Sequence, residues 1–225
     1  MIVNPRVVDI YHGNTVTDFG KAHNFGIRGV IHKAVQGAGI TDPAYAVRRP
    51  RALAAGLLWG AYAFNTGEKV ADQVAHFLKV AQPDAHTLMA LDFEDNKASE
   101  MSLAQAVEYL QRIDDAIGRH AWLYSGNRLK TLICNATDAQ WDEIGKHPLW
   151  LCEYGPVAKM HDDDGDQLPW DAPTLWQFTG DGFGPQPHAV PGMQNKMDIN
   201  SFAGTDDQLA AAWPGAPIAA APAAA

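Results

Sequence analysis

Short apolar runs alternate with helical segments through the first half of this chain, and this alternation most limits the fold that it can adopt. The runs have the length of strands, and the segments between them repeat apolar residues at helical spacing. Strand–helix alternation requires right-handed crossovers and therefore a parallel sheet. The eight predicted strands are Val7–Tyr11, Gly29–Val35, Leu58–Phe64, Thr87–Glu94, Ala121–Ser125, Leu149–Tyr154, Thr174–Thr179 and Lys196–Phe202.

Five segments carry a helical pattern. The clearest is Ser102–Ile117, which opens with an N-capping serine and aligns its large apolar residues on one stripe. The others are Thr17–Phe25, Pro43–Ala55, Lys69–Val80 and Asp138–Ile144. Loops rich in proline and glycine follow the last helix. Eight short strands, with fewer helices in the second half, predict an α/β fold of the irregular TIM-like barrel type rather than an open doubly wound sheet.

Composition sets the size of the fold and excludes some partners. The chain has 225 residues, of which 47% are hydrophobic and 19% charged, as in a soluble globular domain with a sizeable core. We expect one catalytic domain over residues 1–213 and a disordered Pro/Ala-rich tail over 214–225. The net charge of −9 argues against nucleic acid, because phosphate binding needs a basic surface. We expect a monomer.

No stretch approaches the ~20 apolar residues that span a membrane, and the N-terminus lacks an apolar signal core. We therefore expect no membrane partner, and a protein made in the cytoplasm without a signal peptide.

The strand that leads into Asp92 and Glu94 ends in carboxylates. Side chains two residues apart on a strand point the same way, about 6.6 Å apart at ~3.3 Å per residue. Two carboxyl groups on one face repel, so they tend to hold different protonation states. A protonated acid beside a charged one suits the cleavage of a glycosidic bond. On their own, solvated acids at a strand end would explain the pair equally well.

Other predicted strands also end in polar residues. In a parallel β/α barrel the functional side chains gather at the C-terminal ends of the strands, which would bring Asp9 and Asp198 beside Asp92 and Glu94. Aspartate is depleted in strands, so generally polar strand ends explain these four acids poorly. Aromatic and amide side chains near the same ends could bind sugar rings and hydroxyls. They are Tyr11, Tyr62, Tyr124, Tyr154, Gln177 and Asn200.

The sequence carries no pattern typical of a metal or cofactor site. The acidic loop His161–Asp166 lacks the alternating ligands and the distal glutamate of an EF-hand. The histidines show no tight metal-ligand spacing, and Gly37–Gly39 lacks the rest of a dinucleotide fingerprint. The two cysteines do not make a disulfide framework. We expect no cofactor and no metal.

These motifs, in this order and spacing, resemble the glycoside hydrolase family 25 lysozymes (N-acetylmuramidases) from about Val7 to Trp213. The most specific segments are the strand start at Asp9, Leu91–Glu94, Leu175–Thr179 and Met197–Asn200. The resemblance implies an irregular β/α barrel that hydrolyses the β-1,4 bond between N-acetylmuramic acid and N-acetylglucosamine in peptidoglycan.

Roles for individual residues follow from the same resemblance. It implies that Glu94 is the proton donor and that Asp92 either stabilises positive charge on the sugar or orients its acetamido group. Asp9 and Asp198 match the two further acids of the pocket. The positions expected to shape the sugar site are Tyr62, Tyr124 and Gln177.

The chain departs from the family pattern after Asp9, where Tyr11 replaces a small residue, and at Gln36 and Ala63, where a carboxylate and an imidazole are usual. The four acids are retained, so activity remains the expectation. Two alternatives stay open. One is a non-catalytic sugar-binding module on the same barrel. The other is a chitinase-like glycosidase, although the fuller Asp-rich motif of that class is missing before Asp92.

The expected biological role is that of a phage or prophage endolysin. An enzyme of this kind would act on the bacterial cell wall after release by a holin. An effector released by a secretion system would show the same sequence features.

Overall fold

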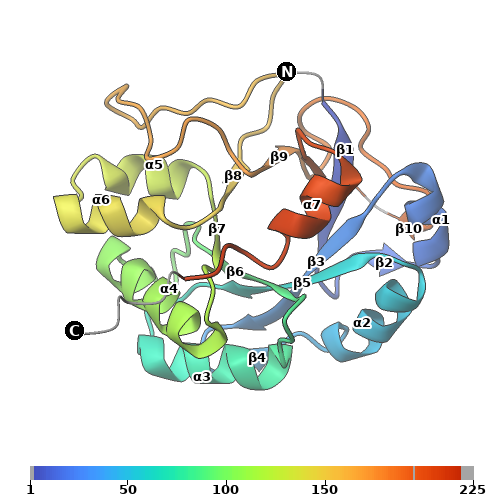
Figure 1. Ribbon diagram of the computed structural model, residues 1–225, viewed down its shortest axis with the longest axis horizontal. Helices are drawn as coiled ribbons and strands as arrows, with labels where there is room; N and C mark the ends of the chain where they lie inside the picture. Colours follow the sequence, from blue (N-terminus) through green and yellow to red (C-terminus); the bar gives the residue numbers. More distant parts are fainter. Residues whose placement is uncertain (1–2, 195, 219–225) are drawn as a thin grey trace, which may run out of the picture.

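The computed structural model describes residues 3–194 and 196–218, and its centre is a closed barrel of eight strands (Figure 1). Strand β1 pairs with both β3 and β11, which closes the sheet. The predicted eight-stranded α/β barrel is therefore confirmed. The barrel strands, in order around the sheet, are β1 (Pro5–Ile10), β3 (Gly29–Gln36), β5 (Leu58–Phe64), β6 (Leu88–Asp92), β7 (Trp122–Ser125), β8 (Leu149–Cys152), β9 (Leu175–Thr179) and β11 (Asp198–Ser201).

One barrel strand runs against the others. The neighbouring pairs from β1 through β3 to β9 are parallel, whereas β11 is antiparallel to both β9 and β1. The prediction of a wholly parallel sheet is thus wrong at this strand. The chain returns from β9 without a helix, and an antiparallel partner needs no crossover helix. Asp198 therefore lies at the start of its strand, level with Asp9, and Asn200 lies deeper in the barrel.

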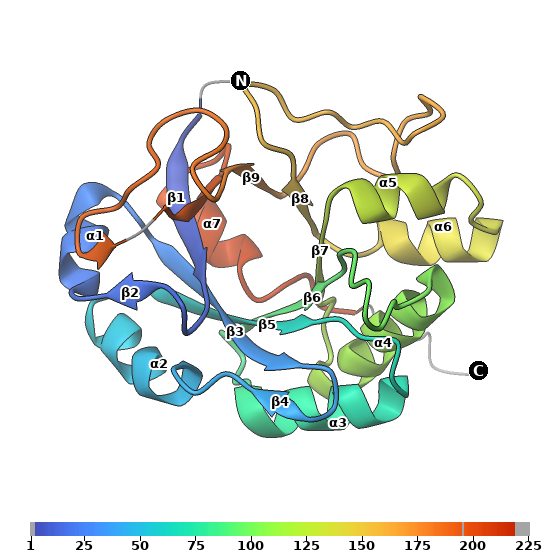
Figure 2. The same ribbon diagram turned by 180° about the vertical axis from the view of Figure 1, so that it is seen from behind.

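Helices cover the outside of the barrel. Figures 1 and 2 show α1 to α4 outside the strands, with α5 and α6 side by side next to α4. All five predicted helices are present, whereas α5 and α7 were not predicted. Helix α4 begins after Ser102, which forms a capping box with Gln105, and ends at Gly118 in the left-handed conformation. The helices are α1 (Phe19–Phe25), α2 (Tyr45–Ala54), α3 (Val70–Ala81), α4 (Leu103–Ile117), α5 (Asn127–Ile133), α6 (Asp138–Gly145) and α7 (Asp206–Ala212).

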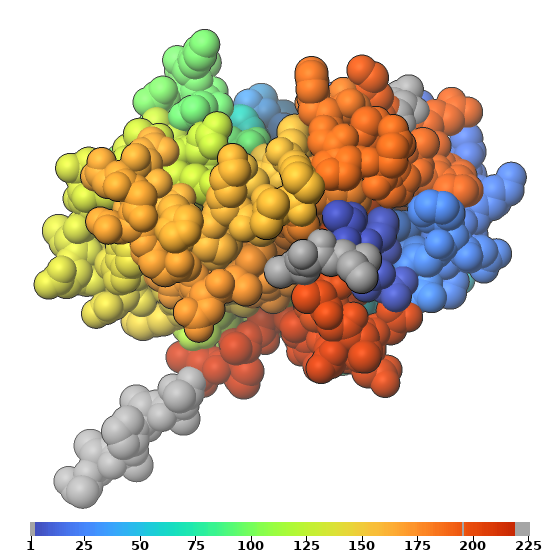
Figure 3. Space-filling model, turned by 90° about the horizontal axis from the view of Figure 1, so that it is seen from above, coloured from blue at the N-terminus to red at the C-terminus, as the bar shows by residue number. Residues whose placement is uncertain are grey.

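Three short strands lie outside the barrel. Strand β4 (Ile40–Thr41) folds back on β3, and β2 (Thr15–Val16) pairs with β10 (Met193–Gln194) in a small separate sheet. The long loops that follow β8 and β9 have no helix. In the space-filling view these segments, coloured yellow to orange, spread across one face of the molecule (Figure 3).

Residues 214–218 begin the predicted tail, but they pack against the domain. The Arg119 guanidinium donates to the Pro214 carbonyl at 2.7 Å, and the backbone N–H of His120 donates to the Ala216 carbonyl at 2.9 Å. The catalytic unit that we propose therefore extends at least to Ile218. The rest of the predicted tail lies outside the described residues. Among the residues that the structure describes, none of the helices has the length and apolar character needed to cross a bilayer.

Side chains fill the interior of the barrel, and Trp213, the residue that follows α7, packs into it at the end opposite the acids. The buried interior includes Trp122 and Trp150, and Trp213 donates its indole N–H to the Trp59 carbonyl at 2.9 Å. The polar residues at the strand ends therefore lie on a close-packed apolar core, which limits how far their side chains can move.

Gly29 allows the Trp213 ring to reach this position, because a Cβ at residue 29 would overlap the ring. We expect Gly29→Ala to lower the free energy of unfolding by about 1–3 kcal/mol, as overpacked cores do. The control is Gly39→Ala, whose added methyl meets no atom within 4 Å. Urea unfolding of the two variants measures the difference. Equal stabilities would contradict this packing.

Candidate active site

The four predicted acids lie together at one end of the barrel. Asp9 and Asp198 are register partners on β1 and β11, Asp92 is the last residue of β6, and Glu94 follows it by two residues. Asp9 and Asp92 are buried, whereas Glu94 and Asp198 are half-buried. The charge of Asp9 contributes to a raised pKa at each of the other three, which shows how close the four groups lie.

Burial raises the pKa of these acids. The pKa of Glu94 rises to about 7, mainly through burial and then through the charge of Asp9. The pKa of Asp198 rises to about 8, through burial followed by the charges of Asp9 and Asp181. The pKa of Asp9 rises only to about 6, because amide hydrogen bonds oppose the effect of burial. A carboxyl group with a pKa near 7 is suited to act as a general acid at neutral pH.

Asp92 has a carboxylate oxygen without a partner. Its Oδ1 is buried and accepts no hydrogen bond from any described residue. Burial and the charge of Glu94 raise its pKa well above the ordinary range, while the Lys33 ammonium acts in the opposite direction. A buried polar atom without a partner is unfavourable, so a substrate N–H or a developing positive charge would stabilise it.

Lys33 belongs to the site, although the sequence analysis did not select it. Its ammonium donates to Gln36 Oε1 at 2.9 Å and lies 4.8 Å from the centre of the Phe64 ring. Glutamine at position 36, where the family usually has a carboxylate, leaves Lys33 without an ion pair from this side chain. Its charge therefore remains available to Asp92. The signal that was missed is a lysine in the middle of a mostly buried strand.

The amides of Gln177 and Asn200 lie beneath Asp9. Gln177 Nε2 donates to both carboxylate oxygens of Asp9 at 3.0 and 3.1 Å, and Asn200 Nδ2 donates to Asp9 Oδ1 at 2.7 Å. Gln177 and Asn200 are 1% and 0% exposed. Both were predicted to bind substrate, but their burial fits a different role, which is to hold Asp9 from below.

The four predicted tyrosines lie at different depths. Tyr124 is buried and donates its hydroxyl to Gln177 Oε1 at 2.8 Å. Tyr62 is half-buried, and after burial the charges of Asp92 and Asp9 raise its pKa further, which places it among the acids. Tyr154 and Tyr11 are exposed. The two exposed rings are therefore the ones available for stacking on sugar rings.

Two depressions in the protein surface lie next to the acids, one beside Glu94 and one beside Asp198. Their volumes are about 500 and about 380 Å³. Because Glu94 lines the first and Asp198 lines the second, a chain of sugars could occupy both and place a glycosidic bond at Glu94. The first is lined by Phe64, Glu94, Asp95, Gly126, Asn127, Arg128, Cys152, Glu153 and Tyr154. The second is lined by Tyr11, Gly13, Asn14, Asp181, Lys196 and Asp198.

Asp181 is a further acid that the sequence analysis missed. Gly180 and Phe183 exchange backbone hydrogen bonds, and Asp181 and Gly182 have φ values of 50° and 83°, as in a tight type I′ turn. The backbone N–H of Asp181 donates to Asp198 Oδ1 at 3.2 Å. The Asp-Gly pair after an apolar strand was the available signal.

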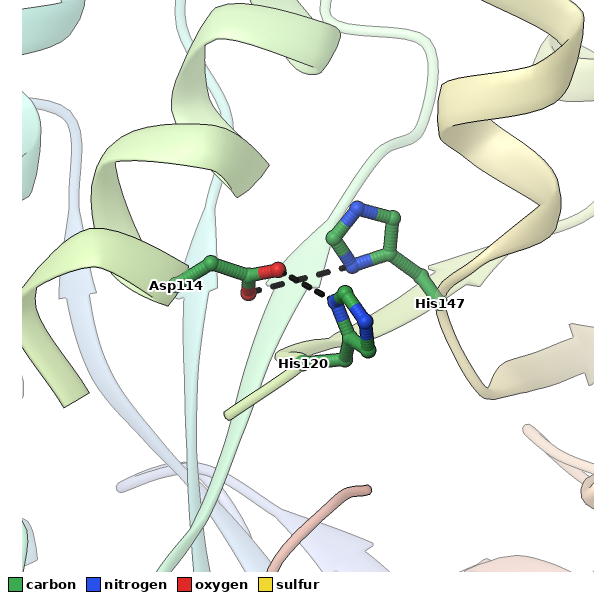
Figure 4. A group of neighbouring side chains, drawn as sticks. All are labelled: Asp114, His120 and His147. Atoms are coloured by element: carbon green, nitrogen blue, oxygen red, sulfur yellow. Dashed lines mark hydrogen bonds and ion pairs between the residues drawn. The ribbon is translucent and has the colours of Figure 1, made fainter. Parts of the chain in front are cut away.

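A second group of titratable side chains lies at the opposite end of the barrel, near the starts of β7 and β8. Figure 4 shows Asp114, His120 and His147, whose potential ligand atoms lie within 4.8 Å of one another. Each side chain already has a partner. His120 Nδ1 is 2.5 Å from Asp114 Oδ2, the Ala121 N–H donates to Asp114 Oδ1, and His147 Nδ1 lies 2.9 Å from the Ala121 carbonyl oxygen. Hydrogen bonds thus engage the Asp114 carboxylate and the Nδ1 atoms of both histidines, whereas His147 Nε2 is buried with no hydrogen-bond partner among the described residues.

A cluster of carboxyl groups with raised pKa values, at the mouth of an irregular β/α barrel and between two clefts with aromatic side chains, defines a glycoside hydrolase. Comparison with known families makes this assignment specific. The family model described as Glycosyl hydrolases family 25 matches residues 8–186, so the chain belongs to this family.

Solved structures share the fold. The bacterial lysozyme from Streptomyces coelicolor matches with a TM-score of 0.74 at 19% identity, covering 95% of this chain and 98% of that one. The muramidase from Trichobolus zukalii matches with a TM-score of 0.68 at 26% identity, covering 94% and 99%. The catalytic domain of endolysin ply40 from bacteriophage P40 of Listeria monocytogenes matches with a TM-score of 0.70 at 18% identity, covering 96% and 98%. No curated protein sequence matches the chain.

Proposed function

We propose that this enzyme is an N-acetylmuramidase that hydrolyses the β-1,4 bond between N-acetylmuramic acid and N-acetylglucosamine in peptidoglycan. The observation that carries the proposal is the pairing of Glu94, whose pKa is about 7, with the unpartnered oxygen of Asp92 at the mouth of a family 25 barrel. Similarity to the Trichobolus zukalii muramidase supports it.

In the proposed reaction Glu94 donates its proton to the oxygen of the leaving sugar and then, as a base, activates water. Asp92 stabilises the positive charge that develops on the sugar, or orients the substrate's acetamido group through its free oxygen. The ionised form of Asp9 supplies negative charge that keeps Glu94 protonated near neutral pH, whereas Asp198, whose pKa is about 8, is itself largely protonated there and lines the second depression. The protein's own carboxyl groups thus supply the acid, the base and the charge stabilisation.

The two depressions indicate how the glycan would bind. We propose that sugars on either side of the cleaved bond occupy the cleft beside Glu94 and the pocket beside Asp198. Tyr154 and Tyr11, which are 38% and 43% exposed, would stack on sugar faces in the two sites.

Digestion of two purified polymers separates this proposal from its alternatives. We expect soluble fragments from peptidoglycan and none at a comparable rate from chitin. Comparable release from chitin would favour the chitinase-like alternative. Binding to peptidoglycan by the folded protein, with no fragment released from several wall types, would favour the non-catalytic module.

The pH profile tests the role of Asp9. Because Glu94 must be protonated to act as the acid, kcat/KM should fall as the pH rises through about 7. The charge of Asp9 raises the pKa of Glu94, so Asp9→Asn should move this alkaline limb to lower pH. We would measure kcat/KM from about pH 4 to about pH 9. This range includes the raised pKa values of both Asp9 and Glu94. A limb that stays in place, or moves upward, would contradict this role.

We further propose that the protein is a monomeric phage or prophage endolysin whose catalytic unit includes residues 1–213. The fold that it shares with the ply40 endolysin domain supports this role. We propose that it reaches the wall after release by a holin or a secretion system. Expression in a susceptible host should therefore cause lysis only when a holin is co-expressed, and lysis without one would count against the proposal.

A further inference from the structure

We infer that Trp150 is a positioning residue of this active site, because its indole N–H fixes the amide orientation of Asn200 and thereby the hydrogen bond that Asn200 donates to Asp9. The inference rests on the proposed function, in which Asp9 is one of the four acids. Trp150 lies in an apolar strand, where the sequence alone indicates a core residue; the inference gives it a role in positioning the acids.

The contacts form a short chain from the interior of the barrel to the acid cluster. Trp150 Nε1 donates to Asn200 Oδ1 at 2.6 Å, and Asn200 Nδ2 donates to Asp9 Oδ1 at 2.7 Å. Trp150 is 1% exposed and Asn200 is fully buried. Because water does not reach these two side chains, each polar atom depends on the partner that the protein supplies.

The indole N–H helps to set which way the amide faces, together with Asp9 and the Val7 carbonyl, to which Asn200 Nδ2 also donates at 3.3 Å. An indole nitrogen can only donate, whereas an ionised carboxylate can only accept. The observed orientation places the amide oxygen at the donor and the amide nitrogen at the acceptor. A flipped amide would set donor against donor at Trp150 and acceptor against acceptor at Asp9. Both mismatches oppose the flip as long as Trp150 keeps its N–H.

The second amide beneath Asp9 is oriented less strictly. Gln177 Oε1 accepts from the Tyr124 hydroxyl at 2.8 Å, but a hydroxyl can donate or accept and would tolerate a flipped amide. The Trp150 ring also supports the tyrosines of the mouth, since its ring centre lies 4.4 Å from that of Tyr124 and 6.4 Å from that of Tyr62. Phenylalanine at position 150 would keep an aromatic ring beside these tyrosines, remove the donor and leave unfilled the volume of the second indole ring.

Loss of the donor should reach Glu94 through Asp9. Without the N–H of Trp150, Asn200 Oδ1 is left buried with no donor, and only the acceptors of its Nδ2 still hold the amide. The hydrogen bond to Asp9, which favours the charged form of Asp9, should therefore weaken. The pKa of Asp9 should therefore rise above about 6. A less ionised Asp9 raises the pKa of Glu94 less, so the alkaline limb of activity should move to lower pH.

The test compares Trp150→Phe with Trp122→Phe. Trp122 is also fully buried in the barrel interior, but its indole nitrogen has no hydrogen-bond partner among the described residues. Both variants lose an indole from the interior, and only the first loses a hydrogen bond into the site. The readouts are the Asp9 carboxyl titration by carbon-13 NMR, assigned with Asp9→Asn, and the pH profiles of kcat and KM.

For Trp150→Phe we expect an upward shift of the Asp9 midpoint, an alkaline limb at lower pH and a kcat reduced by about tenfold with little change in KM. Trp122→Phe should match the wild type in the Asp9 midpoint and in the position of the limb. If Trp150→Phe does not fold, the benzothiophene analogue of tryptophan is placed at position 150 instead. It keeps the shape of the indole and lacks only the N–H donor, so it should also raise the Asp9 midpoint.

An unchanged Asp9 midpoint in the folded Trp150→Phe variant, or equal shifts in both tryptophan variants, would overturn the inference. The Asp9 titration is measured on the protein without substrate. A wild-type protein that released nothing from peptidoglycan would therefore refute the proposed function and would leave the hydrogen-bond test intact.

Discussion

Glu94→Gln should reduce kcat for the release of peptidoglycan fragments by about 10²- to 10⁴-fold, the usual contribution of a general acid. Glutamine keeps the shape of the side chain and can still hydrogen-bond to the sugar oxygen, but it cannot transfer a proton. Because substrate binding should be retained, KM should change much less than kcat. Steady-state kinetics on soluble peptidoglycan fragments measures both values.

The matched control removes a carboxylate from a helix outside the barrel. Glu108 lies on α4, pairs with Arg112 at 2.7 Å and is about half exposed. Glu108→Gln should retain wild-type kinetics.

The stability of Glu94→Gln gives a second check. The pKa of Glu94 is raised in the folded protein, so burying its ionised form lowers the free energy of unfolding at pH values above the ordinary carboxyl pKa. Glu94→Gln should therefore be at least as stable as the wild type at pH 8. A stable variant with full activity would contradict the role of Glu94.

Asp92→Asn should reduce kcat by about 10²- to 10³-fold, the cost of removing one preorganised electrostatic group from a buried site. The amide keeps the side-chain volume but cannot ionise, so it cannot oppose the positive charge that develops on the sugar. If Asp92 instead orients the acetamido group, a flipped amide could still accept its N–H through oxygen. The loss would then be smaller and would include KM.

The control for Asp92→Asn is Asp115→Asn, on the exposed surface of α4. This substitution removes a charge from the outside of the barrel, so both kinetic constants should remain near those of the wild type. Wild-type kcat in a folded Asp92→Asn variant would remove Asp92 from the mechanism.

The sequence predicts the barrel because its signals are local. Each apolar run that ends in a polar residue forms a strand, and each capped, striped segment forms a helix. The same rule predicts the acid cluster, since parallel strands end at one mouth. Asp92 and Glu94 meet Asp9 there, even though more than eighty residues separate them along the chain.

Other features depend on contacts that a single sequence does not show. The reversal of β11 follows from a connection without a helix, and it changes Asn200 from a strand-end residue to a buried one. The role of Trp150 follows from that reversal, because pairing with β1 and β9 brings Asn200 beneath Asp9. Helix α5 begins directly after β7 at Gly126 without a side-chain cap, and Leu209 is the one residue of α7 that is buried, so neither segment shows a clear start signal together with an apolar stripe.

The sugar at the new reducing end tests the central claim most directly. Purified peptidoglycan is digested with the wild-type enzyme and with Glu94→Gln, the products are reduced with borohydride, and the terminal sugar alcohol is identified by mass spectrometry. We expect N-acetylmuramitol ends from the wild type and almost none from the variant. N-acetylglucosaminitol ends, or equal release by both proteins, would contradict it.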